Sequence, residues 1–172
     1  MVRVLSIEKD DIIIEQMEEL YKSVWNKSIK GPLVRHIKYK GFRGNRIISA
    51  EGRLIGFVYG YISLPEQYYH TLLSNELSQE EYDFWLKDCF EVVELVIHPL
   101  HRKRGFGSKL IRDLLLGVDN KTAVLTTQVT NTAAQSLYTG LGWTVIKNAF
   151  ILNKTEAPFM IMGKVLGKKN GL

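Results

Sequence analysis

The sequence contains little cysteine and no long apolar run. Cys89 is the single cysteine of the 172 residues, so the chain can form no intrachain disulfide and offers no pair of thiolates to a structural metal ion. None of the four histidines forms a metal-ligand pattern. Nowhere do about 18 apolar residues follow one another, and the N-terminus lacks the apolar core of a signal peptide. We therefore expect a soluble, cytoplasmic protein that binds no metal and no membrane.

Internal repeats, low-complexity tracts and convincing linkers are also absent. Hydrophobic residues make up 45% of the chain and charged residues 24%, which is an ordinary globular composition. A chain of this length can bury about two thirds of the surface that its unfolded form exposes. We expect a single domain over residues 1–166, followed by a frayed C-terminal tail at residues 167–172.

Charge is distributed unevenly along the chain. The net charge is +5, but residues 64–91 contain seven acidic residues and one lysine, a net charge of −6, which leaves +11 for the rest. A basic body favours an anionic partner, and an acidic segment favours a cationic one. A nucleic-acid-binding module would also explain the basic body, but no basic stripe interleaved with aromatic residues runs along the chain. We therefore expect no nucleic-acid partner.

Helix-type and strand-type patterns alternate along the chain. Ile13, Met17 and Leu20 recur at helical spacing after a capping aspartate at position 10 or 11, and Ser78 with Glu81 forms a capping-box signal for an inserted helix. The order predicts an α/β fold with a mixed sheet of about six to seven strands and flanking helices. The expected strands are 3–6, 46–50, 54–63, 91–98, 122–129, 143–147 and 159–165; the expected helices follow position 10, surround Gly31-Pro32, lie within an insertion at 64–90, and span 107–117 and 131–141.

The most informative segment joins the expected strand 91–98 to the expected helix 107–117. Gly105 and Gly107 let the backbone approach a ligand closely, and a helix N-terminus favours negative charge. Arg102, Lys103 and Arg104 add cationic side chains, and arginine can hold phosphate oxygens bidentately. The turn lacks the Gly-x-x-x-x-Gly-Lys-Ser/Thr pattern and the third glycine of Gly-x-Gly-x-x-Gly. The sequence therefore predicts a phosphate-binding turn of another class.

Two motifs in this region resemble those of a known family. Arg102-Lys103-Arg104-Gly105-Phe106-Gly107 is similar to the acetyl-CoA-binding motif Arg/Gln-x-x-Gly-x-Gly/Ala of the GNAT superfamily of N-acetyltransferases. Asn131-Thr132-Ala133-Ala134-Gln135-Ser136-Leu137-Tyr138, followed by Gly140-Leu141-Gly142-Trp143, resembles that family's Asn-x-x-Ala-x-x-x-Tyr-x-x-x-Gly-Phe, with Trp143 in place of Phe. The resemblance implies the GNAT acyl-CoA N-acyltransferase fold, with acetyl-CoA as co-substrate.

The resemblance also implies roles for individual residues. Tyr138 would protonate the departing CoA thiolate, and Glu91 or Glu94 would take the proton of the amine. Strict alternation along a strand would put these two glutamates on opposite faces, and the choice between them stays open. The residues implied to bind acetyl-CoA are Leu95, Val96, Ile97, Arg102, Lys103, Arg104, Gly105, Phe106, Gly107, Ser108, Asn131 and Ala134.

The acceptor is expected at the acidic insertion, where GNAT proteins commonly build the acceptor site. Its acids and aromatic rings could bind a cation, so we expect a primary amine, of a small molecule or a peptide, that attacks the thioester directly. Three alternatives stay open: a non-catalytic acetyl-CoA-binding or interaction domain of the same fold, a basic nucleic-acid-binding module, and transfer of a longer acyl chain. The last strand, 159–165, could pair across a homodimer as an exposed edge.

Overall fold

The computed structural model describes residues 1–167. Of the expected tail at 167–172, all but the first residue lies outside the described residues. The chain divides into two compact units. The first unit consists of Met1–Tyr61 and Val92–Gly117, and the second of Ile62–Glu91 and the chain from Val118 onward. None of the helices in residues 1–167 combines the length and the apolar character that a bilayer crossing requires.

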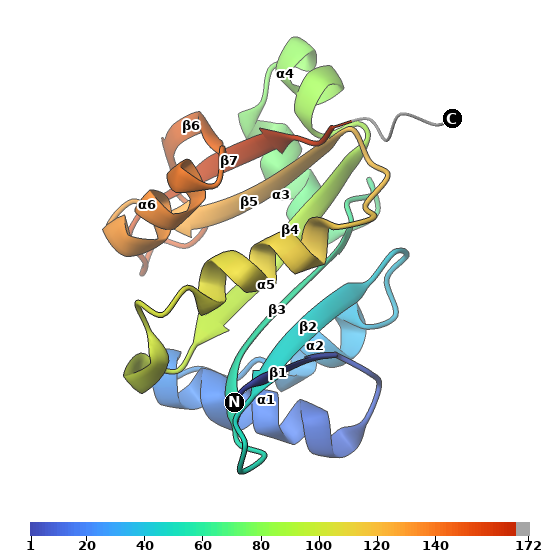
Figure 1. The fold of residues 1–172 in the computed structure, drawn as a ribbon. Coiled ribbons are helices and arrows are strands. Elements are labelled where there is room, and N and C mark those ends of the chain that lie inside the picture. Colours follow the sequence, from blue (N-terminus) through green and yellow to red (C-terminus); the bar gives the residue numbers. More distant parts are fainter. Residues whose placement is uncertain (168–172) are drawn as a thin grey trace. The chain divides into compact units, whose positions relative to one another are not determined.

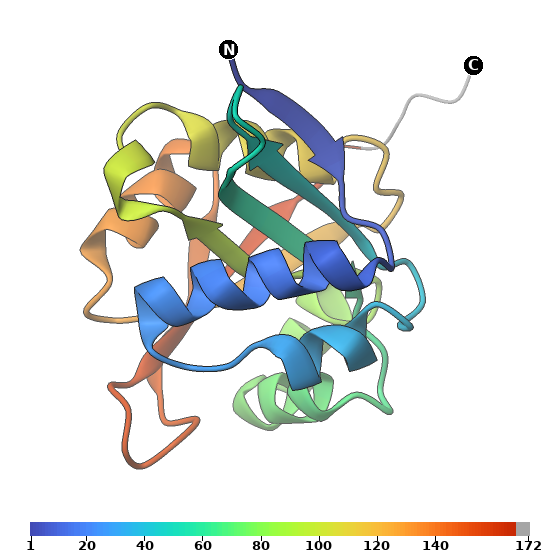
Figure 2. The same ribbon diagram turned by 90° about the horizontal axis from the view of Figure 1, so that it is seen from below.

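The first unit is built on three strands and most of a fourth. Its strands are neighbours in the order β1-β2-β3-β4, and the β1–β2 and β2–β3 pairs are antiparallel. The elements are β1 (Arg3–Ser6), α1 (Asp11–Trp25), α2 (Lys30–His36), β2 (Arg43–Ile48), β3 (Leu54–Ile62), β4 (Cys89–Ile97) from Val92 onward, a 3-10 helix (Pro99–His101) and α5 (Phe106–Leu115). In Figures 1 and 2, α1 and α2 cover one face of these strands and α5 covers the other.

The core of the first unit lies under α1 and α2. The side chain of Asp10 accepts hydrogen bonds from the amides of Ile12 and Ile13, which starts α1 where the aspartates predicted a helix. One apolar face of α1 and α2 then packs on β3 and β4. Burying each such large side chain stabilises the fold by about 1.5–3 kcal/mol. The fully or almost fully buried members of this cluster include Met17, Leu33, Phe57, Tyr59 and Val96.

The second unit starts with the first residues of β4 and continues the strand order as β4-β5-β7-β6. Cys89–Glu91 pairs in parallel with Thr122–Val124, whereas the β5–β7 and β6–β7 pairs are antiparallel. Its other elements are α3 (Tyr68–Glu76), α4 (Gln79–Trp85), β5 (Thr122–Gln128), α6 (Thr132–Gly140), β6 (Thr144–Phe150) and β7 (Phe159–Val165). Leu73, Leu86 and Cys89 belong to the buried cluster beneath α3 and α4. Figures 1 and 2 place α6 on the opposite face of these strands.

The predicted fold class is confirmed, because the seven described strands form parallel and antiparallel pairs and helices flank them. The number of helices in the insertion and several strand boundaries differ from the prediction, with β4 beginning at Cys89 and β6 extending to Phe150. The insertion holds two helices, since Leu77 is extended and the capping box of Ser78 and Glu81 starts α4 afresh. In addition, β2 begins at Arg43. Gly44 lies within this strand. A Cβ atom at that position would come within 2.7 Å of the Ile7 side chain, so the close packing there favours glycine.

Candidate functional site

The predicted phosphate turn lies in the first unit, between β4 and α5. The residues from Arg102 to Gly105 are exposed. Lys103 and Gly105 adopt left-handed conformations, with φ of 60° and 81°. Within residues 1–167, no side chain caps the N-terminus of α5, which leaves its first amides to a ligand or to water. Left-handed turns that lead into a helix N-terminus gather backbone N–H groups around an anion.

Cationic side chains surround this turn. Arg102, Lys103 and Arg104 are exposed, and the Arg102 Nε also donates to the Ile97 carbonyl at 3.2 Å. Lys109, further along α5, is paired with Asp113 at 3.0 Å. The turn thus combines backbone donors with a local excess of positive charge, which suits a phosphate or pyrophosphate.

The predicted residues Leu95, Val96 and Ile97 form the end of β4 just before the turn. Val96 is buried, and the other two are half-buried. The amide of His98 donates to the Ile55 carbonyl at 2.7 Å, so this end of β4 is tied to the start of β3. A side chain at Gly56 would put its Cβ 2.7 Å from the Val96 carbonyl oxygen. The strand is therefore held firmly up to the point where the turn begins.

Glu94 lies on the same strand and meets α1. Its carboxylate accepts a hydrogen bond from the Tyr21 hydroxyl at 3.4 Å. Burial raises the pKa of Glu94 to about 7, against the opposing effects of the Tyr21 hydrogen bond and the positive charge of Lys27. A carboxylate with a pKa near 7 is suited to accept and release a proton at neutral pH.

The second unit holds the other predicted cofactor and acid residues. The Asn131 side chain accepts a hydrogen bond from the Ala134 amide at 3.1 Å, so it caps α6. Ala134 is half-buried on the same helix. Tyr138 is buried, with 7% of its surface exposed, and its ring centroid lies 5.8 Å from that of Trp143. The helix motif thus forms as predicted, with its tyrosine ring inside the unit.

Glu91 also belongs to the second unit, where it pairs with Val124 of β5. Only 5% of its surface is exposed, and its Oε2 has no hydrogen-bond partner among the described residues. Burial raises the pKa of Glu91 to about 8. The group is therefore mostly a neutral acid at pH 7, which needs a partner that this part of the chain does not provide.

The register between β3 and β4 changes along the strands. The Ser63 amide donates to the Cys89 carbonyl at 2.9 Å, whereas His98 donates to Ile55. Eight residues separate the two partners on β3 and nine separate those on β4, so β4 carries one extra residue. The prediction that Glu91 and Glu94 face opposite sides assumed strict alternation along the whole strand, and this alternation is interrupted at one point between Cys89 and His98. The choice between the two glutamates still stays open.

The acidic insertion uses several of its side chains to hold its own structure. Glu81 completes the capping box of α4 and pairs with Lys147 of β6 at 2.8 Å. Tyr82 and Trp85 pack against the buried cluster beneath the helices. Exposed side chains of this insertion include Glu66, Tyr68, Glu76, Glu80, Asp83 and Phe84. This second set is the part of the insertion that can meet a cationic ligand.

Ser63 escaped the sequence analysis, and His70 and Tyr82 were considered only among the aromatic rings of the insertion that could bind a cation. His70 Nδ1 lies 2.8 Å from the Ser63 hydroxyl, and its Nε2 lies 2.9 Å from the Tyr82 hydroxyl. Ser63 and His70 are each 3% exposed. In the sequence they sit 7 and 12 residues apart with no shared period, so only the folded chain brings them together. A histidine within an apolar and aromatic stretch was the one available signal.

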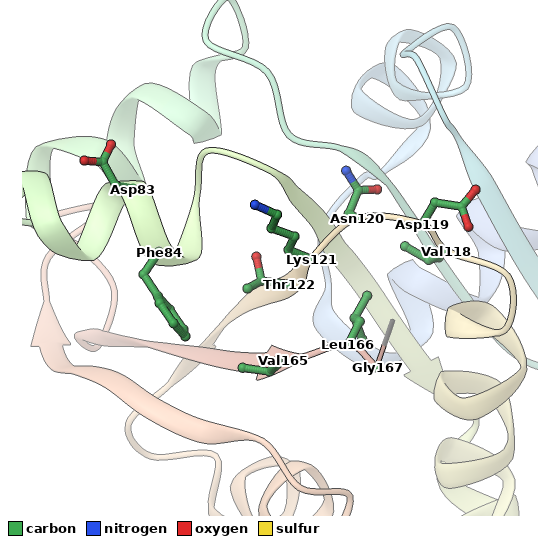
Figure 3. Close-up of a pocket in the computed structure, with 10 residues that line it drawn as sticks. All are labelled: Asp83, Phe84, Val118, Asp119, Asn120, Lys121, Thr122, Val165, Leu166 and Gly167. Carbon is green, nitrogen blue, oxygen red and sulfur yellow. The ribbon is translucent and has the colours of Figure 1, made fainter. Parts of the chain in front are cut away.

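A cavity of about 670 Å³ lies elsewhere in the second unit (Figure 3). Asp83 and Phe84 of α4 line one side of it, and the start of β5 and the end of β7 line the rest. Asp83 and Phe84 belong to the predicted acceptor segment, whereas none of the predicted catalytic or cofactor-binding residues contributes to this cavity. Among the described residues there is also no cluster of three histidine, cysteine, aspartate or glutamate side chains that could hold a metal ion.

Sequence comparison relates the chain to acetyltransferases. The profile of the Acetyltransferase (GNAT) family matches residues 14–143. The GCN5-like protein acetyltransferase Rv2170 of Mycobacterium tuberculosis is 31% identical over 121 residues, which cover 66% of this chain and 59% of that protein. The chain thus matches less than two thirds of the length of this curated relative.

Structural comparison relates the fold to N-acetyltransferases. NAA60 of Arabidopsis thaliana, solved in complex with acetyl-CoA, superposes with a TM-score of 0.72 at 15% identity, over 96% of this chain and 99% of that one. The ribosomal-protein-S18-alanine N-acetyltransferase of Escherichia coli gives 0.69 at 14% identity, over 100% and 99%. At these identities the likeness shows the fold. Since the family profile spans more than half of the sequence, the chain belongs to the acetyltransferase (GNAT) family.

Proposed function

We propose that this protein is an acetyl-CoA-dependent N-acetyltransferase that moves an acetyl group to a primary amine by direct attack. The turn from Arg102 to Ser108 carries the proposal, because it joins left-handed backbone, exposed cations and an uncapped helix N-terminus in one place. Its N–H groups and the side chains of Arg102 and Arg104 would hold the pyrophosphate. When bound, acetyl-CoA supplies an activated thioester carbonyl.

The end of β4 would align the acetyl group. In this proposal, main-chain N–H groups of Leu95, Val96 and Ile97 bind and polarise the carbonyl, and Asn131 with Ala134 lies along the thin arm of the cofactor. The hydrogen bond from the His98 amide to Ile55 and the close packing at Gly56 hold this end of β4 in place. These contacts support the proposal, because a polarising donor must be in position before the reaction begins.

The amine must lose a proton before it can attack. An alkyl amine with a pKa near 10.4 is neutral in about one molecule in two thousand at pH 7, a cost of roughly 4–5 kcal/mol. Glu94 and Glu91 are the two groups proposed to take this proton. Both are carboxyls whose pKa burial raises, to about 7 and about 8, which brings them into the working range of a general base.

Tyr138 is proposed to protonate the CoA thiolate as it leaves. Its support is the match to the family's helix motif and the cap at Asn131, which fixes the start of the helix one turn before Ala134. The acceptor is proposed to be cationic, because the exposed part of the insertion carries Glu66, Glu76, Glu80 and Asp83.

The test is acetyl transfer to a panel of amines, read as the mass gain of one acetyl group. The panel would contain polyamines, aminoglycosides, and peptides with free α- or lysine amines. We expect transfer to at least one class, with Tyr138→Phe reducing kcat by about 10–1000-fold and Glu91→Gln or Glu94→Gln by about 10²–10⁴-fold. Binding of acetyl-CoA without transfer to any amine would contradict the enzymatic proposal and favour a non-catalytic role.

A further inference from the structure

A continuous chain of hydrogen bonds runs through the second unit beneath α3 and α4. It consists of Ser63, His70 and Tyr82, which we call the relay chain. The Ser63 hydroxyl and the Tyr82 hydroxyl bond to the two ring nitrogens of His70, at 2.8 Å and 2.9 Å. Ser63 and His70 are buried and Tyr82 is half-buried, so the chain leads from the interior towards the surface.

The inner end of the relay chain lies on the same sheet face as Glu91. The Ser63 amide donates to the Cys89 carbonyl, so these two residues oppose each other in the ladder. Glu91 is two residues beyond Cys89 in a segment that pairs regularly with β5, and therefore shares its face. Diagonal neighbours of this kind have Cα atoms about 7–8 Å apart, which one water molecule can bridge between a serine and a glutamate side chain.

The buried carboxyl of Glu91 is the second observation that supports a proton path. Its Oε2 is buried and has no hydrogen-bond partner among the described residues. A water placed between it and Ser63 would have two polar partners already, which is the minimum for an ordered buried water. The relay chain gives this acid a route to solvent that the buried carboxyl lacks by itself.

We propose that Ser63, His70 and Tyr82 carry the proton of the acceptor amine from Glu91 to solvent during acetyl transfer. This inference rests on the proposed function, and it selects Glu91 rather than Glu94 as the group that takes the proton. The four side chains all belong to the second unit.

In each cycle, one proton enters the chain from the ammonium group and one proton leaves it to solvent. Glu91 first releases its resting proton along the chain; as a carboxylate it then takes a proton from the ammonium group and passes it through the bridging water to the Ser63 oxygen. The Ser63 proton moves to His70 Nδ1, the proton on Nε2 moves to the Tyr82 oxygen, and the Tyr82 proton leaves to solvent. The histidine ends each transfer in its other neutral tautomer, and the imidazole restores the first tautomer by rotating and exchanging its Nδ1 proton directly with solvent, since reversal along the chain would return the proton to Glu91.

The surroundings of His70 keep it neutral between transfers. Burial lowers the pKa of His70, and the nearby carboxylate of Glu66 offsets part of that effect. Glu66 and Tyr82 are the titratable groups that face it from the flanking loop and from α4. A neutral imidazole with a partner on each nitrogen can pass a proton without holding a charge.

The first test measures turnover. Ser63→Ala breaks the relay chain at its inner end, and Ser74→Ala is the matched control, since the Ser74 hydroxyl donates to the Thr71 carbonyl within α3 and is not a member of the relay chain. We expect Ser63→Ala to lower kcat by about 10-fold or more, with unchanged KM for acetyl-CoA, a larger solvent deuterium isotope effect and a rate that now rises with buffer concentration. Added imidazole should likewise restore part of the kcat that the His70→Ala variant loses.

The second test reads Glu91 without turnover. The infrared C=O band of its protonated carboxyl, identified by its absence in Glu91→Gln, should shift in Ser63→Ala and stay in place in Ser74→Ala. An active wild type whose Ser63→Ala variant matches the control in rate, isotope effect and infrared band would overturn the relay. A wild type that acetylates no amine would instead overturn the proposed function, and the relay's role with it.

Discussion

Glu18 in the first unit and Glu91 in the second are equally buried, each 5% exposed, yet their pKa values move in opposite directions. For Glu18, burial alone would raise the pKa, but hydrogen bonds outweigh it and lower the pKa to about 2. For Glu91, burial acts unopposed and raises the pKa to about 8. The donors to Glu18 are Ser28 Oγ at 2.6 Å, the amides of Ile29 and Lys30 at 2.7 and 2.8 Å, and Lys22 Nζ at 3.1 Å.

This comparison distinguishes a carboxylate that holds the structure together, Glu18, from one that is available for chemistry, Glu91. Glu18 ties α1 to the start of α2 and stays ionised at every physiological pH. Glu91 has one oxygen that no described group satisfies, a state that costs free energy and persists in proteins mainly where a ligand, a water or a reaction uses it.

The largest expected effect is the loss of the Glu18 network. Because the folded pKa lies below the unfolded value near 4.5, the carboxylate stabilises the protein above that pH, and this contribution fades as pH falls towards 2. Glu18→Gln should therefore cost about 2–3 kcal/mol in the free energy of unfolding at pH 7 and roughly 1 kcal/mol less than that at pH 3.5. Urea denaturation at both pH values measures this.

Glu15→Gln is the control for that prediction. Glu15 lies on the same helix and pairs with Lys30 at the surface, and such exposed pairs contribute about 0–1 kcal/mol. If the two variants lost the same free energy of unfolding, the buried hydrogen bonds of Glu18 would contribute no more than an exposed ion pair.

Glu91→Gln should act in the opposite direction. The folded pKa lies above the unfolded one, so the stabilising contribution is complete below about pH 4.5 and is lost as pH rises through 8. The glutamine variant has no such proton to lose, so its stability relative to the wild type should increase by about 2–3 kcal/mol between pH 5 and pH 8. Thermal denaturation across this range measures the effect; a constant difference would show that Glu91 does not titrate there.

Trp143→Phe should have a still smaller effect. The indole Nε1 is buried without a hydrogen-bond partner among the described residues, so the substitution breaks no hydrogen bond there. The gain from deleting an unsatisfied donor and the cost of the smaller ring should nearly cancel, within about 1 kcal/mol. A loss above about 3 kcal/mol in calorimetric unfolding would reveal a partner for the indole.

Tyr21→Phe should give the smallest change, confined to Glu94. Removing a donor to the charged carboxylate should raise its pKa further above 7, by about one unit or less. Carbon-13 NMR of glutamate-labelled protein, with Glu94→Gln for assignment, follows this titration directly. Tyr39→Phe, a ring in the same unit that stacks on His36 and Tyr61, should leave it unmoved.

Periodicity and motif spacing predicted the order of the elements, because each element's signal is local. The turn at Gly105 could be predicted for the same reason: its glycines, cations and following helix are adjacent in the chain. The first helix of the insertion, α3, was missed, because no side chain caps its N-terminus, whereas the capping box of Ser78 and Glu81 predicted α4.

The buried parts of the site could not be predicted from sequence. The relay chain depends on a contact between the end of β3 and two helices, which no local pattern encodes. The register of β4 against β3 shifts by one residue between Cys89 and His98, which sequence alternation cannot detect. Which carboxyls are satisfied is a property of the packed chain, as the contrast between Glu18 and Glu91 makes plain.

Calorimetric titration with acetyl-CoA tests the central claim most directly. It would compare the wild type with Gly105→Glu, which places bulk and negative charge at the turn, and with Gly52→Glu, since both glycines have positive φ and open space around them. We predict micromolar binding by the wild type and by Gly52→Glu, and at least about 100-fold weaker binding by a folded Gly105→Glu. Equal binding by all three, or none by the folded wild type, would contradict the account.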